Sequence, residues 1–307
     1  MGQAYKSDSE ESASDAAERL MMKHFYIITN ELKDPDGKYR RQISSYLKEH
    51  GRDVTVRIGT RTPVNGRPGT DPDEIPEGTD CLIVLGGDGT LLQAARDTVS
   101  REIPLIGINL GNIGYLAEVE TSDMDHAMDC LLRDECQTEE RMMLFGMITA
   151  GDKVIEDHAL NDVVITRSGN IQIMRYNIYV NGHLLNAFLA DGIIVATATG
   201  STGYNLSAGG PIVEPAAKTL VLTPICSPML HARSIILSPD DEITIEIAEG
   251  RSADAVQTVD ASFDGNSIIM LHTGDRVLVR RSSRTTRIIK LTQENFLNTL
   301  RKKMGDV

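Results

Sequence analysis

The 307-residue sequence contains no tryptophan, only four cysteines, and no apolar run near the about 18 residues that a membrane helix requires. Its first residues carry no apolar signal core. Cys81, Cys130, Cys136 and Cys226 form no CxxC pair and no zinc-ligand spacing, and the seven histidines are scattered. These absences argue against a membrane protein, a disulfide-stabilised secreted domain and a protein-built zinc site. We therefore expect a cytoplasmic protein.

Positive charge is also scarce, because 31 Lys and Arg face 44 Asp and Glu, for a net charge of −13. A protein that binds nucleic acid broadly needs a basic surface, so this balance argues against that class. It does not exclude an anionic ligand, because local fields and a bound divalent cation decide that question. Five carboxylates fall within residues 8–18, and the sequence predicts a disordered acidic tail over residues 1–22.

Between residues 24 and 109 the apolar pattern predicts strands alternating with helices, which indicates a Rossmann-like α/β layer with a mostly parallel sheet. CLIVL is apolar on both sides, as in a central parallel strand. The expected strands are HFYIITN (24–30), DVTVRI (53–58), CLIVL (81–85) and PLIGIN (104–109), with helices within 37–51 and 90–99 and a loop over 60–79.

After about residue 135, short apolar runs separated by turns such as AGDK, VNGH and HTGD predict an antiparallel β-sandwich-like domain. A helical pattern returns only in TQENFLNTLRKKM, which we expect to pack back on the first domain. The predicted domains are residues 23–122 (α/β), 123–283 (β-rich), and a C-terminal segment, 284–307, that returns to the first.

The first candidate site is the run Gly86-Gly87-Asp88-Gly89-Thr90, which joins a buried strand to a helix. Ligands bind at this place in open α/β sheets, and glycines let a backbone approach a phosphate closely. Asp88 is awkward beside a phosphate unless it holds a divalent cation or accepts a proton from an attacking hydroxyl. An ordinary tight turn with Asp88 as helix cap fits a lone GGDG equally well.

Two further runs carry polar groups without charge clusters. Residues 191–215 join a strand to a loop rich in Gly, Ser and Thr, whose neutral donors suit phosphates and whose Tyr204 suits stacking on a purine or local packing. Asn161 and Asp162 precede an apolar strand. They suit a capped turn, and also ribose hydroxyls and an adenine edge.

In order, GGDGT (86–90), NLGNIGYL (109–116), ALND (159–162) and DGIIVATATGSTGYNLSAGGP (191–211) resemble the signature of the NAD kinase family over about residues 24 to 300. GGDGT is shared with lipid kinases and phosphofructokinases, whereas the 191–211 run is specific to NAD kinases. The resemblance implies transfer of the γ-phosphoryl group of ATP to the 2′-hydroxyl of the adenosine ribose of NAD. It also implies Mg²⁺ carried with ATP and a homodimer or homotetramer.

By resemblance, Asp88 is the catalytic base, Asn161 and Asp162 hold the adenosine moiety, and Asp191 contacts the nicotinamide side. The implied phosphate-binding residues are Gly86, Gly87, Gly89 and Thr90. The implied NAD-binding residues are Asp88, Gly89, Asn161, Asp162, Gln172, Leu189, Asp191, Thr202, Gly203, Tyr204, Asn205, Leu206, Ser207, Cys226 and Asn266.

The chain departs from the family pattern at Asp162, Ala198 and Gly203, where Glu, Pro and Ala are frequent; each change is conservative in size or charge. Three rival functions are a lipid or sugar-phosphate kinase, a non-catalytic NAD or NADP sensor, and a structural protein. The sequence leaves open the choice between ATP and inorganic polyphosphate as donor, and between NAD and NADH as acceptor.

Overall fold

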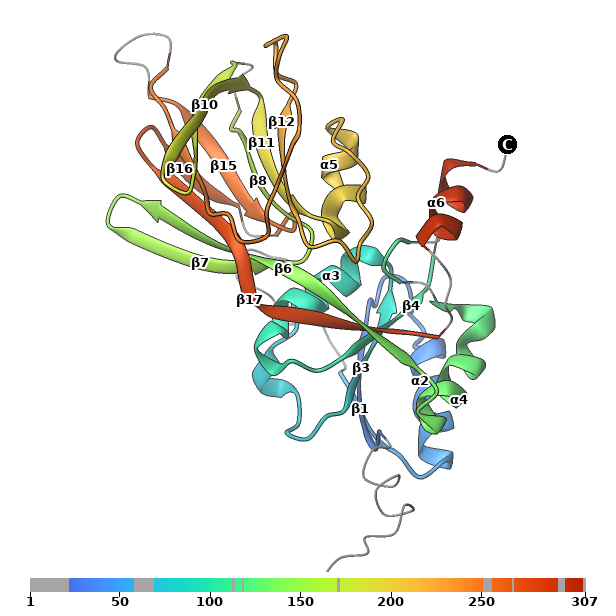
Figure 1. The fold of residues 1–307 in the computed structure, drawn as a ribbon. Coiled ribbons are helices and arrows are strands. Elements are labelled where there is room, and N and C mark those ends of the chain that lie inside the picture. Colours follow the sequence, from blue (N-terminus) through green and yellow to red (C-terminus); the bar gives the residue numbers. More distant parts are fainter. Residues whose placement is uncertain are drawn as a thin grey trace, which may run out of the picture.

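The fold is described from a computed structural model, which covers residues 22–57, 69–111, 114–117, 119–169, 172–250, 256–266, 268–291 and 296–305. The predicted acidic tail, apart from Met22, lies outside these residues. Within them, no helix is long and apolar enough to cross a membrane. The structure has an α/β half and a β-rich half stacked end to end (Figure 1).

A twisted parallel sheet forms the α/β half, in the strand order β2-β1-β3-β4, with the short β5 beside β4. Its strands are β1 (His24–Thr29), β2 (Asp53–Val56), β3 (Cys81–Gly86), β4 (Leu105–Asn109) and β5 (Val119–Glu120). Helices α2 (Lys38–Glu49) and α4 (Met124–Arg133) cover one face, and α3 (Asp88–Asp97) covers the other (Figure 1). The predicted parallel α/β layer is confirmed.

Alternation along β1 explains why helices are needed on both faces of this sheet. Phe25 and Ile27 pack against α2 and α4, whereas Tyr26 and Ile28 pack against α3. Because successive strand residues point to opposite faces of the sheet, a strand with a run of apolar residues must be covered by helices on both faces. The carboxyl ends of β1, β3 and β4 are thereby left as the open edge.

The β-rich half packs two sheets face to face around one apolar core. One contains β6 (Gln137–Ala150), β7 (Lys153–Ala159), β9 (Met174–Val180), β10 (His183–Ala190), β14 (Ile243–Ile247) and β17 (Arg276–Lys290). The other, in spatial order, contains β13 (Ile235–Leu237), β12 (Leu220–Ile225), β11 (Gly192–Thr197), β8 (Asp162–Arg167), β15 (Thr258–Phe263) and β16 (Ile269–His272). The expected antiparallel sandwich is confirmed.

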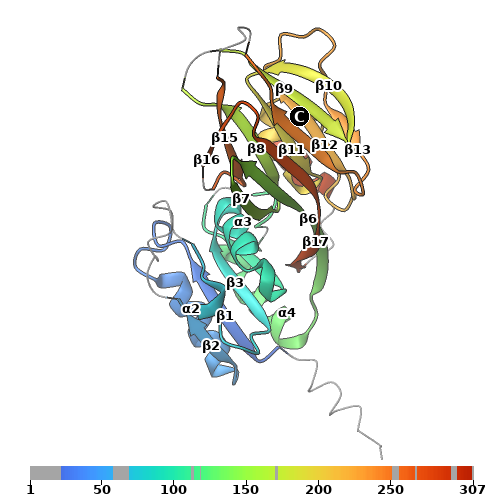
Figure 2. The same cartoon turned by 90° about the vertical axis from the view of Figure 1, so that its left-hand side faces the viewer.

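The two halves are joined by the long strands β6 and β17, which run side by side from one half to the other (Figure 2). The first part of β17 pairs with β14, and Ile288 near its end pairs with Leu105 of the parallel sheet. Helix α6 (Phe296–Met304) follows, and Lys303 lies over the ring of Tyr115. The C-terminal segment therefore returns to the first half, as predicted. The numerical domain boundaries stay predictions.

Some elements are absent from the sequence-based prediction. Helix α4 and strands β7 and β15 were not expected, and β6 and β17 extend beyond MMLFGMITA (142–150) and RVLVRR (276–281), the apolar runs that predict these two strands. The surplus residues of β6 and β17 are largely polar, because these parts of the strands bridge the two halves. Short 3₁₀ turns complete the fold: η1 (Pro72–Glu74), η2 (Val99–Arg101), η3 (Thr121–Asp123) and η4 (Thr199–Thr202).

Candidate active site

The GGDGT run lies at the open edge of the parallel sheet, where β3 ends at Gly86 and α3 begins at Asp88. A β-carbon at Gly86 would overlap the Thr90 side chain, so Gly86 is required for the turn to close on the helix. A β-carbon at Gly89 would meet no atom within 4 Å. The turn is therefore packed against α3 at Gly86, whereas the space beside Gly89 is open.

Asp88 anchors a second segment of the chain to this turn. Its Oδ2 accepts a hydrogen bond from the Tyr115 N–H at 2.7 Å, and its Oδ1 accepts from Leu116 at 3.2 Å and Ala117 at 3.1 Å. A β-carbon at Gly114 would overlap this carboxylate. Part of the NLGNIGYL motif thus wraps the Asp88 side chain, although its residues 112 and 113 lie outside the described part of the chain.

A cavity of about 530 Å³ opens in front of the GGDGT turn. Residues 28–33, at the end of β1 and in the turn that follows it, form one wall, the GGDGT turn forms another, and Arg57, Gly69 and Thr70 close the far side. Its basic side chains are Lys33 and Arg57, and its acidic ones are Glu31 and Asp88. A cavity walled by exposed glycine backbone and cations has the chemistry of a phosphate site.

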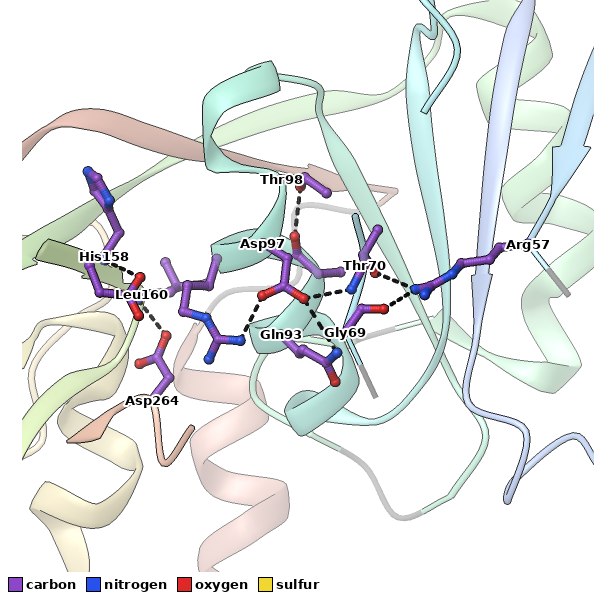
Figure 3. A network of polar contacts seen from close by, with 12 residues as sticks. Arg57, Gly69, Thr70, Gln93, Asp97, Thr98, His158, Leu160 and Asp264 are labelled. Atoms are coloured by element: carbon purple, nitrogen blue, oxygen red, sulfur yellow. Dashed lines mark hydrogen bonds and ion pairs between the residues drawn. The ribbon is translucent and has the colours of Figure 1, made fainter. Parts of the chain in front are cut away.

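A polar network holds the far wall in place (Figure 3). The Asp97 carboxylate accepts from the Thr70 N–H at 2.7 Å and pairs with Arg96 at 2.7 Å. Arg57 in turn donates to the carbonyl of Gly69 and to Thr70 Oγ1. Arg57 is therefore positioned through α3, the same helix that carries Asp88.

The Asn161–Asp162 pair is fixed at the start of β8 by a carboxylate from the turn after β15. Asp264 accepts hydrogen bonds from the N–H groups of Leu160, Asn161 and Asp162 at 2.8, 2.8 and 3.0 Å. The Asp264 N–H returns a bond to the Asp162 carbonyl. Four bonds thus determine where the two side chains of the pair point.

This pair combines a buried acceptor without a donor and a buried carboxyl group. Asn161 Oδ1 is buried and accepts no hydrogen bond from the described residues, and the neighbouring Asp162 is 5% exposed. Burial, with the nearby Asp264 carboxylate as a second cause, raises the pKa of Asp162 to about 7. Unsatisfied buried acceptors are rare and destabilising, and here they mark a place for a ligand with several donors.

The Gly- and Ser-rich loop after β11 supports the pair from the opposite side. Thr197 donates its N–H to the Asn161 carbonyl and its hydroxyl to the Leu160 carbonyl. A β-carbon at Gly200 would overlap the Asn161 backbone, so only glycine permits this close approach. Arg141 of β6, buried, donates to Thr199 Oγ1 at 3.3 Å.

A second cavity, of about 470 Å³, is lined by Asn161, Asp162 and Tyr204, with Leu92 of α3 on the facing side. The Tyr204 side chain is 45% exposed, so its ring is open to a stacking partner. Leu92 and Asp88 lie four residues apart on one face of α3. Both cavities therefore border α3, the helix that begins with the GGDGT aspartate.

Comparison with known proteins agrees with this geometry. The family model of the ATP-NAD kinase N-terminal domain matches residues 25–136, and that of the ATP-NAD kinase C-terminal domain matches residues 160–291. An NAD kinase of Lachnospira eligens is 44% identical over 294 residues, covering 92% of this chain and 100% of the relative. One of Agathobacter rectalis is 45% identical over 285 residues, covering 93% and 99%. The chain belongs to the ATP-NAD kinase family.

Solved structures of the NAD kinase family share the fold. Yeast NADH kinase complexed with NADH superposes with a TM-score of 0.82 at 24% identity, covering 94% of this chain and 89% of the other. An NAD kinase from Archaeoglobus fulgidus in complex with ATP gives 0.71 at 21% identity, covering 91% and 98%. At these identities the likeness establishes the architecture alone.

The residues that the NAD kinase resemblance implies fall into two groups in space. Asn161, Asp162, Thr202, Gly203 and Tyr204 lie together at one end of β8 and β11. Nearby are Leu206 and Ser207, both exposed in α5 (Tyr204–Ser207), and Asn266 in the turn after β15. The side chain of Asn205 is fully buried and hydrogen bonded within the loop, to Ser201, Pro211 and Thr223.

The second group lies at the other end of the same strands. Asp191 precedes β11, whose first residue pairs with Thr166, whereas Ala196 near its end pairs with Asp162. Leu189 donates its N–H to Met229 Sδ, close to the exposed Cys226, and Asp191 pairs with Arg167 at 3.3 Å. Gln172, exposed, precedes β9. Four residues of extended strand, about 13 Å, separate the two ends.

Sequence reasoning missed several polar residues that shape the site. Lys33 and Arg57 line the first cavity, Asp264 anchors the Asn161–Asp162 pair, and Arg141 supports Thr199. Only Asp264 had a signal, in the FDG run at 263–265. The others come from turns and strands with no motif. In the described part of the chain, no three His, Cys, Asp or Glu side chains are grouped as metal ligands.

Proposed function

We propose that this chain transfers the γ-phosphoryl group of ATP to the 2′-hydroxyl of the adenosine ribose of NAD. The observation that carries the proposal is the buried, donor-free Oδ1 of Asn161 beside the buried carboxyl group of Asp162. Ribose hydroxyls and the adenine amino group are the donors that such a pair needs. Tyr204 provides an exposed ring beside them for the purine.

The two cavities divide the substrates between them. The cavity with the exposed glycine backbone, Lys33 and Arg57 suits the triphosphate of ATP, and the cavity with Asn161, Asp162 and Tyr204 suits the adenosine of NAD. Asp88 lies at the start of α3, the helix that both cavities border. Phosphoryl transfer requires chiefly that donor and acceptor be aligned across such a boundary.

Asp88 is the proposed general base. A ribose hydroxyl is a poor nucleophile at neutral pH, and a positioned base is worth about 10²–10⁴-fold. The three N–H groups of residues 115–117 orient the carboxylate, and a carboxylate oxygen has a second lone pair for the substrate hydroxyl. Gly86, Gly87, Gly89 and Thr90 are the proposed contacts to the donor phosphates.

The divalent cation, Mg²⁺ in our proposal, enters with ATP and neutralises charge on its phosphates. The proposed cytoplasmic location rests on the composition of the sequence, and the proposed homo-oligomeric state rests on the family resemblance. The β-rich half also exposes apolar side chains that a second copy could cover. These are Leu230 (84% exposed), Ile268 (65%), Met270 (59%) and Ile236 (56%).

The test is to incubate the purified chain with NAD, [γ-³²P]ATP and Mg²⁺, and to assay the product with an NADP-specific dehydrogenase. We expect labelled NADP, and parallel reactions with polyphosphate or NADH define donor and acceptor preference. NAD binding without any labelled product from these donors and acceptors would support a dinucleotide sensor in place of a kinase.

A further inference from the structure

The turn after β1 carries a lysine whose ammonium group lies over the GGDGT glycines. Lys33 Nζ is 2.8 Å from the position that a β-carbon would take at Gly87, and 3.1 Å from the corresponding position at Gly111. Among the described residues, and apart from Gly87 and its two chain neighbours, no other atom lies within 4 Å of that point at Gly87. A cation therefore faces the backbone of the turn across the space that the missing side chains leave.

The backbone that presents Lys33 is held in place on both sides. The Asn30 carbonyl accepts hydrogen bonds from the N–H groups of Lys33 and Asp34. The Asn30 side chain accepts from the Leu32 N–H and donates to Thr90 Oγ1 at 3.3 Å. Asp34, 2% exposed, accepts from the Tyr39 and Arg40 N–H groups at the start of α2. Lys33 thus extends from a fixed turn, and only its own side chain is free to adjust.

Lys33 and Arg57 are the two basic side chains that line this cavity, and they differ in their contacts with the rest of the protein. Arg57 is engaged by Gly69, Thr70 and Glu74. Lys33 makes no ion pair with any residue of the described part of the chain. A second unpartnered group lines the same space, because the buried Thr29 Oγ1 has no hydrogen-bond partner there. The Lys33 ammonium group and the Thr29 hydroxyl are therefore both available to a ligand in this cavity.

We propose that Lys33 binds the terminal phosphates of the nucleoside triphosphate donor and neutralises charge on the group being transferred. The assignment rests on the proposed kinase function and adds a residue outside the motifs. An ammonium group is a point-charge phosphate ligand with three donors, and its flexible stem lets it follow the phosphate during transfer. Thr29 Oγ1 provides a neutral donor to the same anion.

The variant is Lys33→Met, which keeps most of the apolar stem and removes the charge. The matched control is Lys48→Met, on an exposed position of α2. Loss of one charged hydrogen bond predicts that the KM for ATP rises about 10- to 100-fold with a lower kcat. The KM for NAD should stay within about twofold, and Lys33→Arg should recover most of the ATP affinity because it restores the charge.

Equilibrium binding separates this proposal from the kinase proposal. Calorimetry with Mg·ATP and with inorganic tripolyphosphate should show the same loss of affinity in Lys33→Met, and no loss in Lys48→Met. This readout holds even for a chain that makes no NADP. Unchanged affinity for both ligands, or an equal loss of ATP and NAD affinity, would overturn the role of Lys33. Thermal melting verifies that each variant is folded.

Discussion

Asp162→Asn should make the protein more stable and a worse enzyme. Burial and the Asp264 carboxylate raise the pKa of Asp162 to about 7, from an ordinary value of 3.8. The unfolded chain ionises Asp162 above pH 3.8, whereas the folded chain keeps the proton up to about pH 7. The stability contribution of this group is therefore complete at low pH and is lost as pH rises through this window.

The magnitude follows from the shift. One pKa unit corresponds to about 1.4 kcal/mol, so the full shift corresponds to about 4 kcal/mol, of which about 2 kcal/mol is lost between pH 5 and pH 7. Asparagine has nearly the same shape and no ionisation. The difference in free energy of unfolding between Asp162→Asn and the wild type should therefore grow by about 3 kcal/mol from pH 5 to pH 8.

Urea denaturation at pH 5, 6, 7 and 8 measures this difference. Asp152→Asn, in the exposed turn between β6 and β7, is the control and should leave the pH dependence unchanged. At pH 8, where Asp162 is ionised, the same variant should raise the KM for NAD about tenfold or more, because a charged acceptor for ribose hydroxyls is lost. A stability difference that does not change with pH, or that favours the wild type at pH 8, would refute the reasoning.

Two other variants test the support of the Asn161–Asp162 pair. Asp264→Asn removes a charged acceptor shared by three N–H groups. It should therefore lower the free energy of unfolding by about 2–3 kcal/mol. In steady-state kinetics it should raise the KM for NAD more than the KM for ATP. Gly200→Ala forces a methyl group against the Asn161 backbone; it should cost about 1–3 kcal/mol in urea denaturation and weaken NAD binding in calorimetry. Equal effects of either variant on ATP and NAD would contradict this assignment of the cavity.

Much of the fold could be predicted because the apolar patterns that determine its strands and helices lie within short segments of the sequence. Strands such as CLIVL are apolar on both sides, and helix α3 follows a glycine turn, so the parallel layer could be derived from periodicity. Helix α4 was missed even though its apolar residues are spaced for one buried face. The polar extensions of β6 and β17 had no strand-like pattern, since they are set by the junction of the two halves.

The site was predictable only where a motif spans it. The spacing around Asp88, Asn161 and Tyr204 identified both cavities. It could not show that Asp88 is wrapped by residues 114–117 or that Asp264 holds the Asn161 backbone, since these are contacts between segments distant in sequence. The resemblance assigned Asn161 to the adenosine and Asp191 to the nicotinamide side of NAD, and the length of β11 separates these two residues.

The most direct test of the central claim is the turnover of Asp88→Asn measured together with its affinity for NAD. If Asp88 is the base at the boundary of the two cavities, kcat should fall by about 10²–10⁴-fold. The Kd for NAD from calorimetry should stay measurable, and the melting temperature should show a folded protein. Near-normal turnover in this variant would contradict the account, because the hydroxyl would then lose its proton without Asp88.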